Sequence, residues 1–204
     1  EALSAVLPLE TKDHITVNKL GMNVSTVGLG GGGTRVFGHS SLSLNLDYQN
    51  LSPYYRVYPS RTDFKQPYGM FSGAAQYRYT PDERTVFKLY AGYDRTSFSN
   101  YADADRHLFG LGENNVYLNT TFRKRAASGW NWFFGAAYSF YDRRVGGAVT
   151  GGDAWSERQQ ELHLKVRSFR QFTPWLRLDA GVETFIRSYR DYYRFELLYD
   201  ENRM

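Results

Sequence analysis

Few residues of this chain stand at spacings that chemistry requires, and the most conspicuous set is a glycine run. Gly28-Leu29-Gly30-Gly31-Gly32-Gly33 fits the glycine pattern of a dinucleotide-binding loop in form. That loop needs a strand before it, a helix after it and an acidic residue further on, whereas the residues after Gly33 are turn-like with no helical period. The Lys-Ser/Thr of a phosphate loop is also missing. The run is therefore interpreted as a glycine-rich strand end, where the sheet curves or another segment approaches closely.

A second candidate for chemistry is His107, which lies near Asp103 and Asp105 in the sequence. Such a group can hold a metal ion or serve a protease or acyltransferase. No serine or second histidine stands at a telling spacing, and the chain has four His and no Cys. We therefore expect no catalytic residue, metal or cofactor, and we interpret the protein as not an enzyme. His163 is expected on a polar strand face.

Tyrosines and charges remain as candidates for binding. Two tyrosine groups are expected in loops, where they stack on a sugar, cap a hydrophobic ligand or anchor the protein at a membrane surface. They are Tyr54, Tyr55 and Tyr58, and Tyr189, Tyr192 and Tyr193. A set of alternating charges is expected to face a lumen and to contact a plug or a permeating anion, or to pair across neighbouring strands. It comprises Arg167, Arg177, Asp179, Glu183 and Arg187.

The elements that position these residues are stretches in which apolar and polar side chains alternate. In the segment from Leu42 to Tyr48 every even position is apolar and every odd one polar, which gives a strand one apolar and one polar face. About eight such stretches follow one another, and we expect each to lie in a strand of about 10 to 12 residues, long enough to cross a bilayer at the usual tilt. They cover residues 19–26, 42–49, 71–79, 87–94, 116–123, 130–140, 161–167 and 176–187.

The connections between these stretches are alternately short and long, a pattern typical of an antiparallel transmembrane β-barrel wall in the bacterial outer membrane. We expect the long loops at 51–67, 95–113 and 142–157 to be extracellular. Aromatic residues cluster at both ends of the segment from Trp130 to Phe140, as in the girdles at the two membrane surfaces. A soluble β-sandwich explains the alternation equally well but not the strand length or the loop pattern.

Composition limits the remaining classes. The chain has 204 residues with 17% aromatic content, which is too rich in large rings for a disordered segment. It has no apolar run of the ~18 to 20 residues that a membrane-spanning helix needs. The net charge is +4, but Lys and Arg are spread among Asp and Glu, so we expect no nucleic-acid partner. The first residues do not form a secretory leader, and we expect that a leader was removed or that the sequence is an internal piece.

Several short segments of the sequence resemble those of a known family. They are Glu1-Ala2-Leu3 with Leu9-Glu10-Thr11-Lys12, Leu42 to Asp47 with Asn50-Leu51-Ser52-Pro53-Tyr54-Tyr55, Phe87-Lys88-Leu89-Tyr90, and Asn115-Val116-Tyr117-Leu118-Asn119. The chain resembles the mid-barrel region of TonB-dependent outer-membrane receptors, particularly those of Bacteroidota. The resemblance implies a plugged barrel of about 22 strands, with residues 1–204 forming part of its wall. The family's plug and TonB-contacting box are not in this sequence.

The resemblance further implies energy-coupled uptake of a nutrient. The partners would be outer-membrane lipid and the TonB machinery acting through the plug, and a surface lipoprotein partner stays open. The substrate also stays open among iron chelates, vitamins, oligosaccharides and peptides. The alternatives are a complete small eight-stranded barrel acting as adhesin or structural protein, an outer-membrane enzyme, and a soluble carbohydrate-binding sandwich. The small closed barrel predicts that the first and last strands pair.

Overall fold

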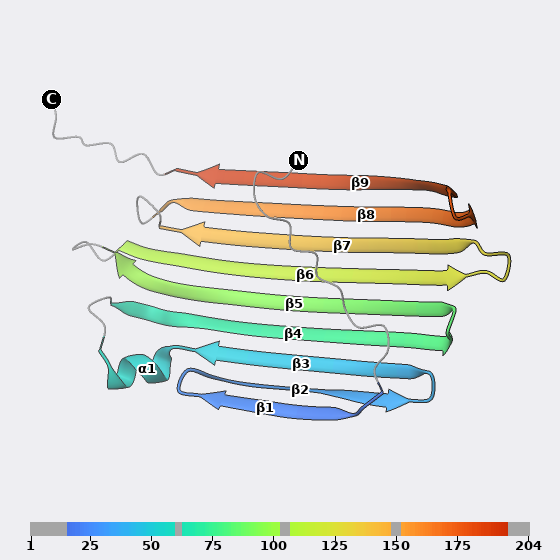
Figure 1. Ribbon diagram of the computed structural model, residues 1–204. Coiled ribbons are helices and arrows are strands. Elements are labelled where there is room, and N and C mark those ends of the chain that lie inside the picture. The colour runs from blue at the N-terminus through green and yellow to red at the C-terminus, as the bar shows by residue number, and fades with distance from the viewer. Residues whose placement is uncertain (1–15, 60–62, 103–106, 148–151, 196–204) are drawn as a thin grey trace.

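A computed structural model describes residues 16–59, 63–102, 107–147 and 152–195. They form one antiparallel sheet of nine strands in chain order, with each strand hydrogen-bonded to the next (Figure 1). The strands are β1 (Lys19–Ser25), β2 (Gly28–Phe37), β3 (Ser40–Asn50), β4 (Phe64–Asp82), β5 (Thr85–Ala102), β6 (His107–Arg125), β7 (Asn131–Gly146), β8 (Ala154–Thr173) and β9 (Leu176–Arg194). The predicted all-β, antiparallel fold class is confirmed.

Tight turns join the strands at one end of the sheet, on the right in Figure 1. Gly38 turns the chain from β2 to β3 with a φ of 55°, a conformation that glycine adopts without strain. Between β4 and β5, the Asp82 carboxylate accepts the backbone N–H of Arg84 at 2.7 Å. Between β8 and β9, the Thr173 hydroxyl accepts the N–H of Leu176 at 3.0 Å. These local side-chain bonds explain why the short connections predicted from the sequence are tight turns.

The opposite end of the sheet carries longer connections and α1 (Ser52–Val57) (Figure 1). This short helix occupies part of the connector expected at 51–67, and β4 already begins at Phe64. Helices in the described ranges are all too short or too polar to cross a bilayer. The connections β3–β4 and β7–β8 are longer than the turns beside them, as the sequence predicts, but the connection between β5 and β6 is reduced to residues 103–106 and is no longer than the one between β6 and β7, residues 126–130.

Six of the strands are much longer than predicted. Strands β4 to β9 have 16 to 20 residues. The loops expected at 95–113 and 142–157 are therefore mostly strand. Beyond Arg95 and Asp142 the face that was apolar becomes polar, and apolar residues such as Phe98, Leu111 and Val145 lie on the opposite face instead, so the alternation of the earlier stretches does not continue. Backbone pairing with the neighbouring strands nevertheless continues. The sequence pattern marks where one face is apolar, and that region is shorter than the strands.

The N-terminal part also differs from the prediction, since nine strands replace the eight expected. The glycine run is not a strand end: it forms most of β2 and pairs with both β1 and β3. A β-carbon on Gly30 or Gly32 would collide with the side chain of Asp47 or Asn45, respectively. The glycines thus leave room for polar side chains of β3 to lie across β2. Because β2 leads into β3 and not into a helix, the dinucleotide-loop pattern has no structural basis here.

The strand register arranges side chains in rows that run across the sheet. One row on the apolar face consists of Leu89, Thr120, Ala136, Leu164 and Thr184. On β7 the apolar stretch runs from Trp132 to Phe140, which is about 27 Å along an extended strand and roughly 21 Å high at a 40° tilt. This height is close to that of the lipid-facing band of outer-membrane barrels, about 25 Å. We call these rows the apolar band.

The sheet has a single layer in the described part of the chain, and the apolar band is uncovered. Leu44 is 50% exposed, and Val145 is the one buried hydrophobic residue among those described. The two packed sheets that a soluble sandwich requires are not formed by these residues. Strands β1 and β9 lie at opposite edges and do not pair with one another. The described residues therefore do not form the closed small barrel considered as an alternative.

Candidate ligand-contacting surface at the loop end of the sheet

The five predicted lumen-facing charges lie on the face opposite the apolar band and are all paired. Asp179 binds two guanidinium groups, Nε of Arg167 at 2.8 Å and Nη2 of Arg177 at 3.0 Å. Arg187 pairs with Glu161 on β8. Pairing within the sheet, one of the two roles expected for these residues, is thus confirmed.

A further pair of bonds holds Glu183 on the same face. Its carboxylate lies 3.1 Å from Nζ of Lys165 and 2.7 Å from Nε2 of His163. His163 also stacks on Phe185 with ring centroids 4.2 Å apart, so it lies on the polar face as predicted. Since these charges neutralise one another, this part of the face offers little net charge to a passing ion.

Of the two tyrosine groups, the first lies in the connection between β3 and β4, as predicted, and the second does not lie in a loop. Tyr54, Tyr55 and Tyr58 belong to α1 or its C-terminal end, where Tyr55 stacks on Phe64 at 4.8 Å. The second group is not in a loop, because β9 continues to Arg194. Strand alternation splits this group: Tyr189 and Tyr193 lie on the polar face, and Tyr192 lies on the opposite face beside Ser156. Only two of these three tyrosines can therefore share a ligand on one face.

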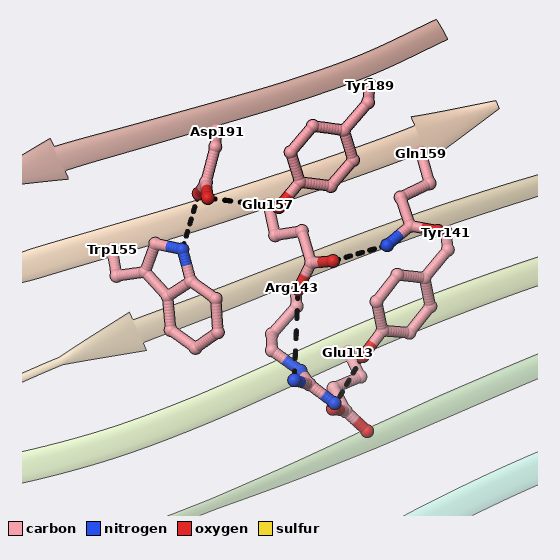
Figure 2. A network of polar contacts seen from close by, with 8 residues as sticks. All are labelled: Glu113, Tyr141, Arg143, Trp155, Glu157, Gln159, Tyr189 and Asp191. Carbon is pink, nitrogen blue, oxygen red and sulfur yellow. Dashed lines mark hydrogen bonds and ion pairs between the residues drawn. The ribbon is translucent and has the colours of Figure 1, made fainter. Parts of the chain in front are cut away.

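A network that the sequence reasoning missed lies on the polar face where β6 to β9 extend beyond the apolar band (Figure 2). We call it the rim cluster; its members are Glu113, Tyr141, Arg143, Trp155, Glu157, Gln159, Tyr189 and Asp191. All occupy alternate positions of the four strands and so point to the same side.

Arg143 is central to one half of the rim cluster. Its Nε lies 2.6 Å from Oε1 of Glu113, and its Nη1 lies 3.8 Å from Oε2 of Glu157. The Tyr141 hydroxyl donates to the same Glu113 oxygen at 2.9 Å, and the guanidinium lies over the Tyr141 ring at 5.3 Å. Gln159 donates to Glu157. The side chains are thereby fixed before any ligand arrives, which lowers the entropy cost of binding.

Asp191 is central to the other half of the rim cluster, where uncharged groups donate hydrogen bonds to its carboxylate. It accepts hydrogen bonds from Nε1 of Trp155 at 2.5 Å and from the Tyr189 hydroxyl at 3.0 Å. The Trp155 ring stacks on Tyr193 with centroids 5.8 Å apart and planes at 3°. Tyr193 in turn is parallel to Phe195 at 6.0 Å, and these two residues are 54% and 70% exposed. These three stacked rings lie beside a fixed carboxylate, and we call them the aromatic platform.

Several members of the rim cluster have shifted pKa values. Burial raises the pKa of Tyr141 to about 12, and its hydrogen bond to Glu113 acts in the same direction. Burial opposes ionisation of Asp191, but hydrogen bonds from Trp155 and Tyr189 outweigh it and lower the pKa of that carboxyl. The hydrogen bond to Glu113 raises the pKa of Arg143. Three carboxylates therefore face one guanidinium, so the rim cluster is net negative.

This combination of groups favours neutral or cationic ligands with flat apolar surfaces. Exposed rings pack against the apolar face of a sugar or another ring, and carboxylates accept hydrogen bonds from hydroxyl or ammonium groups.

The described residues contain no group of three or more metal-ligating side chains. His107 begins β6, whereas Asp103 and Asp105 lie outside the described residues.

The rim cluster has a signal in the sequence that the prediction did not use. Trp155, Glu157 and Gln159 are spaced by two, and so are Tyr189, Asp191 and Tyr193. In a strand this spacing places each set on one face. The sequence pattern nevertheless predicts loops for these segments, because their other faces are not apolar.

A comparison of this chain with protein-family models, with curated proteins and with solved structures gave no match.

Proposed function

We propose that this chain forms part of the wall of an outer-membrane β-barrel transporter. The uncovered apolar band supports this proposal most strongly. A contiguous apolar face of this size is unfavourable in water. It therefore needs either lipid or a second protein layer against it. The aromatic residues at its edges, such as Trp132 and Phe140, suit the two membrane interfaces.

The polar face supports a hydrated lumen. Its charges are paired at the surface of the sheet and half exposed, as in the interior of a barrel with water or a polar plug inside. The free edges of β1 and β9 are suited to pairing with further strands of a larger barrel. We infer TonB-dependent uptake through a plug from the family resemblance, and on this view the chain carries no enzymatic activity.

The rim cluster is the surface that we assign to the transported solute. It lies beyond the apolar band on the lumen side, at the end that carries the longer connections. Outer-membrane barrels place their longer loops outside the cell, so a solute would meet this surface on entry. The net negative charge and the aromatic platform favour a neutral or cationic nutrient over an anion.

Site-directed spin labelling tests the membrane placement. This chain contains no Cys, so single cysteines at Leu44, Trp132 and Leu178 can be labelled in native vesicles, with Asn45 and Phe133 as polar-face controls. We expect the first three labels to be accessible to lipid-dissolved oxygen and the two controls to be accessible to a water-soluble relaxant instead. Exclusion of oxygen from all three band sites would remove the basis of the proposal.

Transport needs a separate test in cells. A strain lacking the gene should lose growth on one nutrient supplied as an iron chelate, vitamin, oligosaccharide or peptide, and a strain lacking TonB should show the same loss. The full reading frame should encode a protein several times longer than this chain. A short product that inserts in the membrane without any uptake defect would favour the small structural barrel.

A further inference from the structure

The face that carries the apolar band becomes strongly basic immediately beyond it. The last apolar row comprises Tyr93, Val116 and Phe140, continued by Gln160 and Ser188. The next row, two residues further along each strand, comprises Arg95, Asn114, Asp142, Arg158 and Arg190. Arg144 and Arg194 lie on the same face further out. Five arginines thus share this surface with one carboxylate, Asp142.

The arrangement of these arginines leaves positive charge uncompensated. Asp142 is held by Nε of Arg144 and Nη2 of Arg158, both at 3.1 Å. Arg158 faces Arg190 directly across β8 and β9, and like charges in that position destabilise a sheet. Arg190 has no side-chain hydrogen bond or ion pair with any residue in the described ranges. An anion placed between the two guanidinium groups would relieve this repulsion.

The basic surface is also hollowed. A depression of about 730 Å³ is lined by Arg144, Arg158, Arg190 and Tyr192, together with small residues such as Ser156 and Gly110. The small residues leave space between the arginines that is larger than a single phosphate needs. The depression is continuous with the apolar band, since Arg158 lies over the ring of Phe140, the last aromatic residue of the band on β7.

We propose that this surface binds a phosphate-bearing lipid, with its head group between Arg158 and Arg190 and its acyl chains along the apolar band. Guanidinium groups bind phosphate through paired, charge-assisted hydrogen bonds. A lipid is favoured over a free anion because the apolar band begins one row away. The inference rests on the membrane placement proposed above and assigns a specific lipid contact to it.

A lipid titration tests this site. The protein from the full reading frame is purified in detergent, stripped of lipid and titrated with lipid A, an acylated glucosamine disaccharide that carries two phosphates, and bound lipid is measured by native mass spectrometry. Lipid A without its phosphates is the matched ligand control. We expect the phosphate-free form to bind about tenfold more weakly or worse, as expected for loss of a charged hydrogen bond.

The informative variant is Arg190→Gln, because it removes no side-chain hydrogen bond or ion pair among the described residues. Arg187→Gln is its control: the same residue type on the same strand, three positions away on the polar face. We expect Arg190→Gln to weaken lipid A binding about tenfold and the double variant R158Q/R190Q to weaken it further, while Arg187→Gln leaves it unchanged. Equal losses for Arg187→Gln and Arg190→Gln, or equal binding of both lipid forms, would overturn the proposal.

Three further results separate a lipid site from a free-anion site, and failure of this inference from failure of the proposed function. If inorganic phosphate competes fully with lipid A, the arginines form a free-anion site and the lipid assignment is wrong. If spin labels at Leu44 and Trp132 contact lipid but lipid A does not bind, only this inference fails. If those labels do not contact lipid, the proposed function fails and this inference fails with it.

Discussion

Two adjacent alanines on β7 provide a sharp test of which face meets lipid. Ala136 lies in the middle of the apolar band, between Thr120 and Leu164. Ala137 lies on the polar face, between Asn119 and His163. The two positions share one strand, one depth and one side-chain size. An arginine introduced at each therefore differs only in the face to which its charge is directed.

The expected difference is large. Arginine near the bilayer midplane on the lipid face of a barrel costs about 2 to 4 kcal/mol, whereas substitutions on the lumen face are tolerated. Ala137 also adjoins a small hollow lined in part by Asn119, His163 and Lys165, which gives a longer side chain room. We expect Ala136→Arg to reduce the folding equilibrium constant about thirtyfold to a thousandfold, and Ala137→Arg to change stability by about 0.5 kcal/mol or less.

The assay is reversible urea unfolding in lipid bilayers, followed by the heat-modifiable mobility of the folded barrel and by tryptophan emission. Gln160→Arg provides a depth control, because it lies at the edge of the band, where a cost of about 0 to 1 kcal/mol is expected. If Ala136→Arg and Ala137→Arg were equally destabilising, or if both were neutral, the apolar band would not face hydrocarbon and the membrane assignment would be refuted.

Three further predictions concern a turn, the rim cluster and its titration. Gly38→Val should destabilise the protein by about 1 to 2 kcal/mol because of its positive φ, and Gly38→Asn by less, as measured by urea unfolding. Trp155→Ala or Tyr193→Ala should raise the half-saturating nutrient concentration for uptake about tenfold without changing membrane insertion; reduced insertion would point to a structural role instead. Tyr141 has a pKa raised in the folded state, so its contribution to stability is present below its ordinary pKa and is lost as the pH rises to about 12. Tyr141→Phe should remove this alkaline loss, observed as phenolate absorbance and as the unfolding midpoint.

The sequence predicted the fold best where the two strand faces differ. Leu42 to Tyr48 and Trp132 to Phe140 alternate clearly, and they are strands with the predicted faces. The prediction failed where alternation is absent for a physical reason. Glycines in β2 make space for the polar side chains of β3, and beyond Asp142 the face of the apolar band becomes polar while Val145 lies on the other face. Backbone hydrogen bonds to neighbouring strands hold these segments in the sheet, and the side-chain pattern of one strand does not report them.

The sequence predicted the candidate site only where the strands alternate clearly, as it did for the fold. Pairing of Arg167 with Asp179 was predictable because both lie in well-patterned strands. The contact between Trp155 and Asp191 depends on the register of β8 and β9, which places residues 36 positions apart side by side. No local pattern specifies that register beyond the apolar band. The tyrosine groups were found by composition, but only the strand geometry separates Tyr192 from Tyr189 and Tyr193.

The extended ends of β8 and β9 place two oppositely charged surfaces back to back. On the polar face Glu157 faces Asp191 across the strands, and on the face of the apolar band Arg158 faces Arg190, one residue along each strand. The two acids are satisfied within the chain, Glu157 by Gln159 and Arg143 and Asp191 by Trp155 and Tyr189. Of the two arginines, Arg158 binds Asp142, whereas Arg190 has no hydrogen-bond or ion-pair partner among the described residues. Those residues thus supply donors to both acids but no acceptor to Arg190, and the lipid phosphate that we propose would supply one.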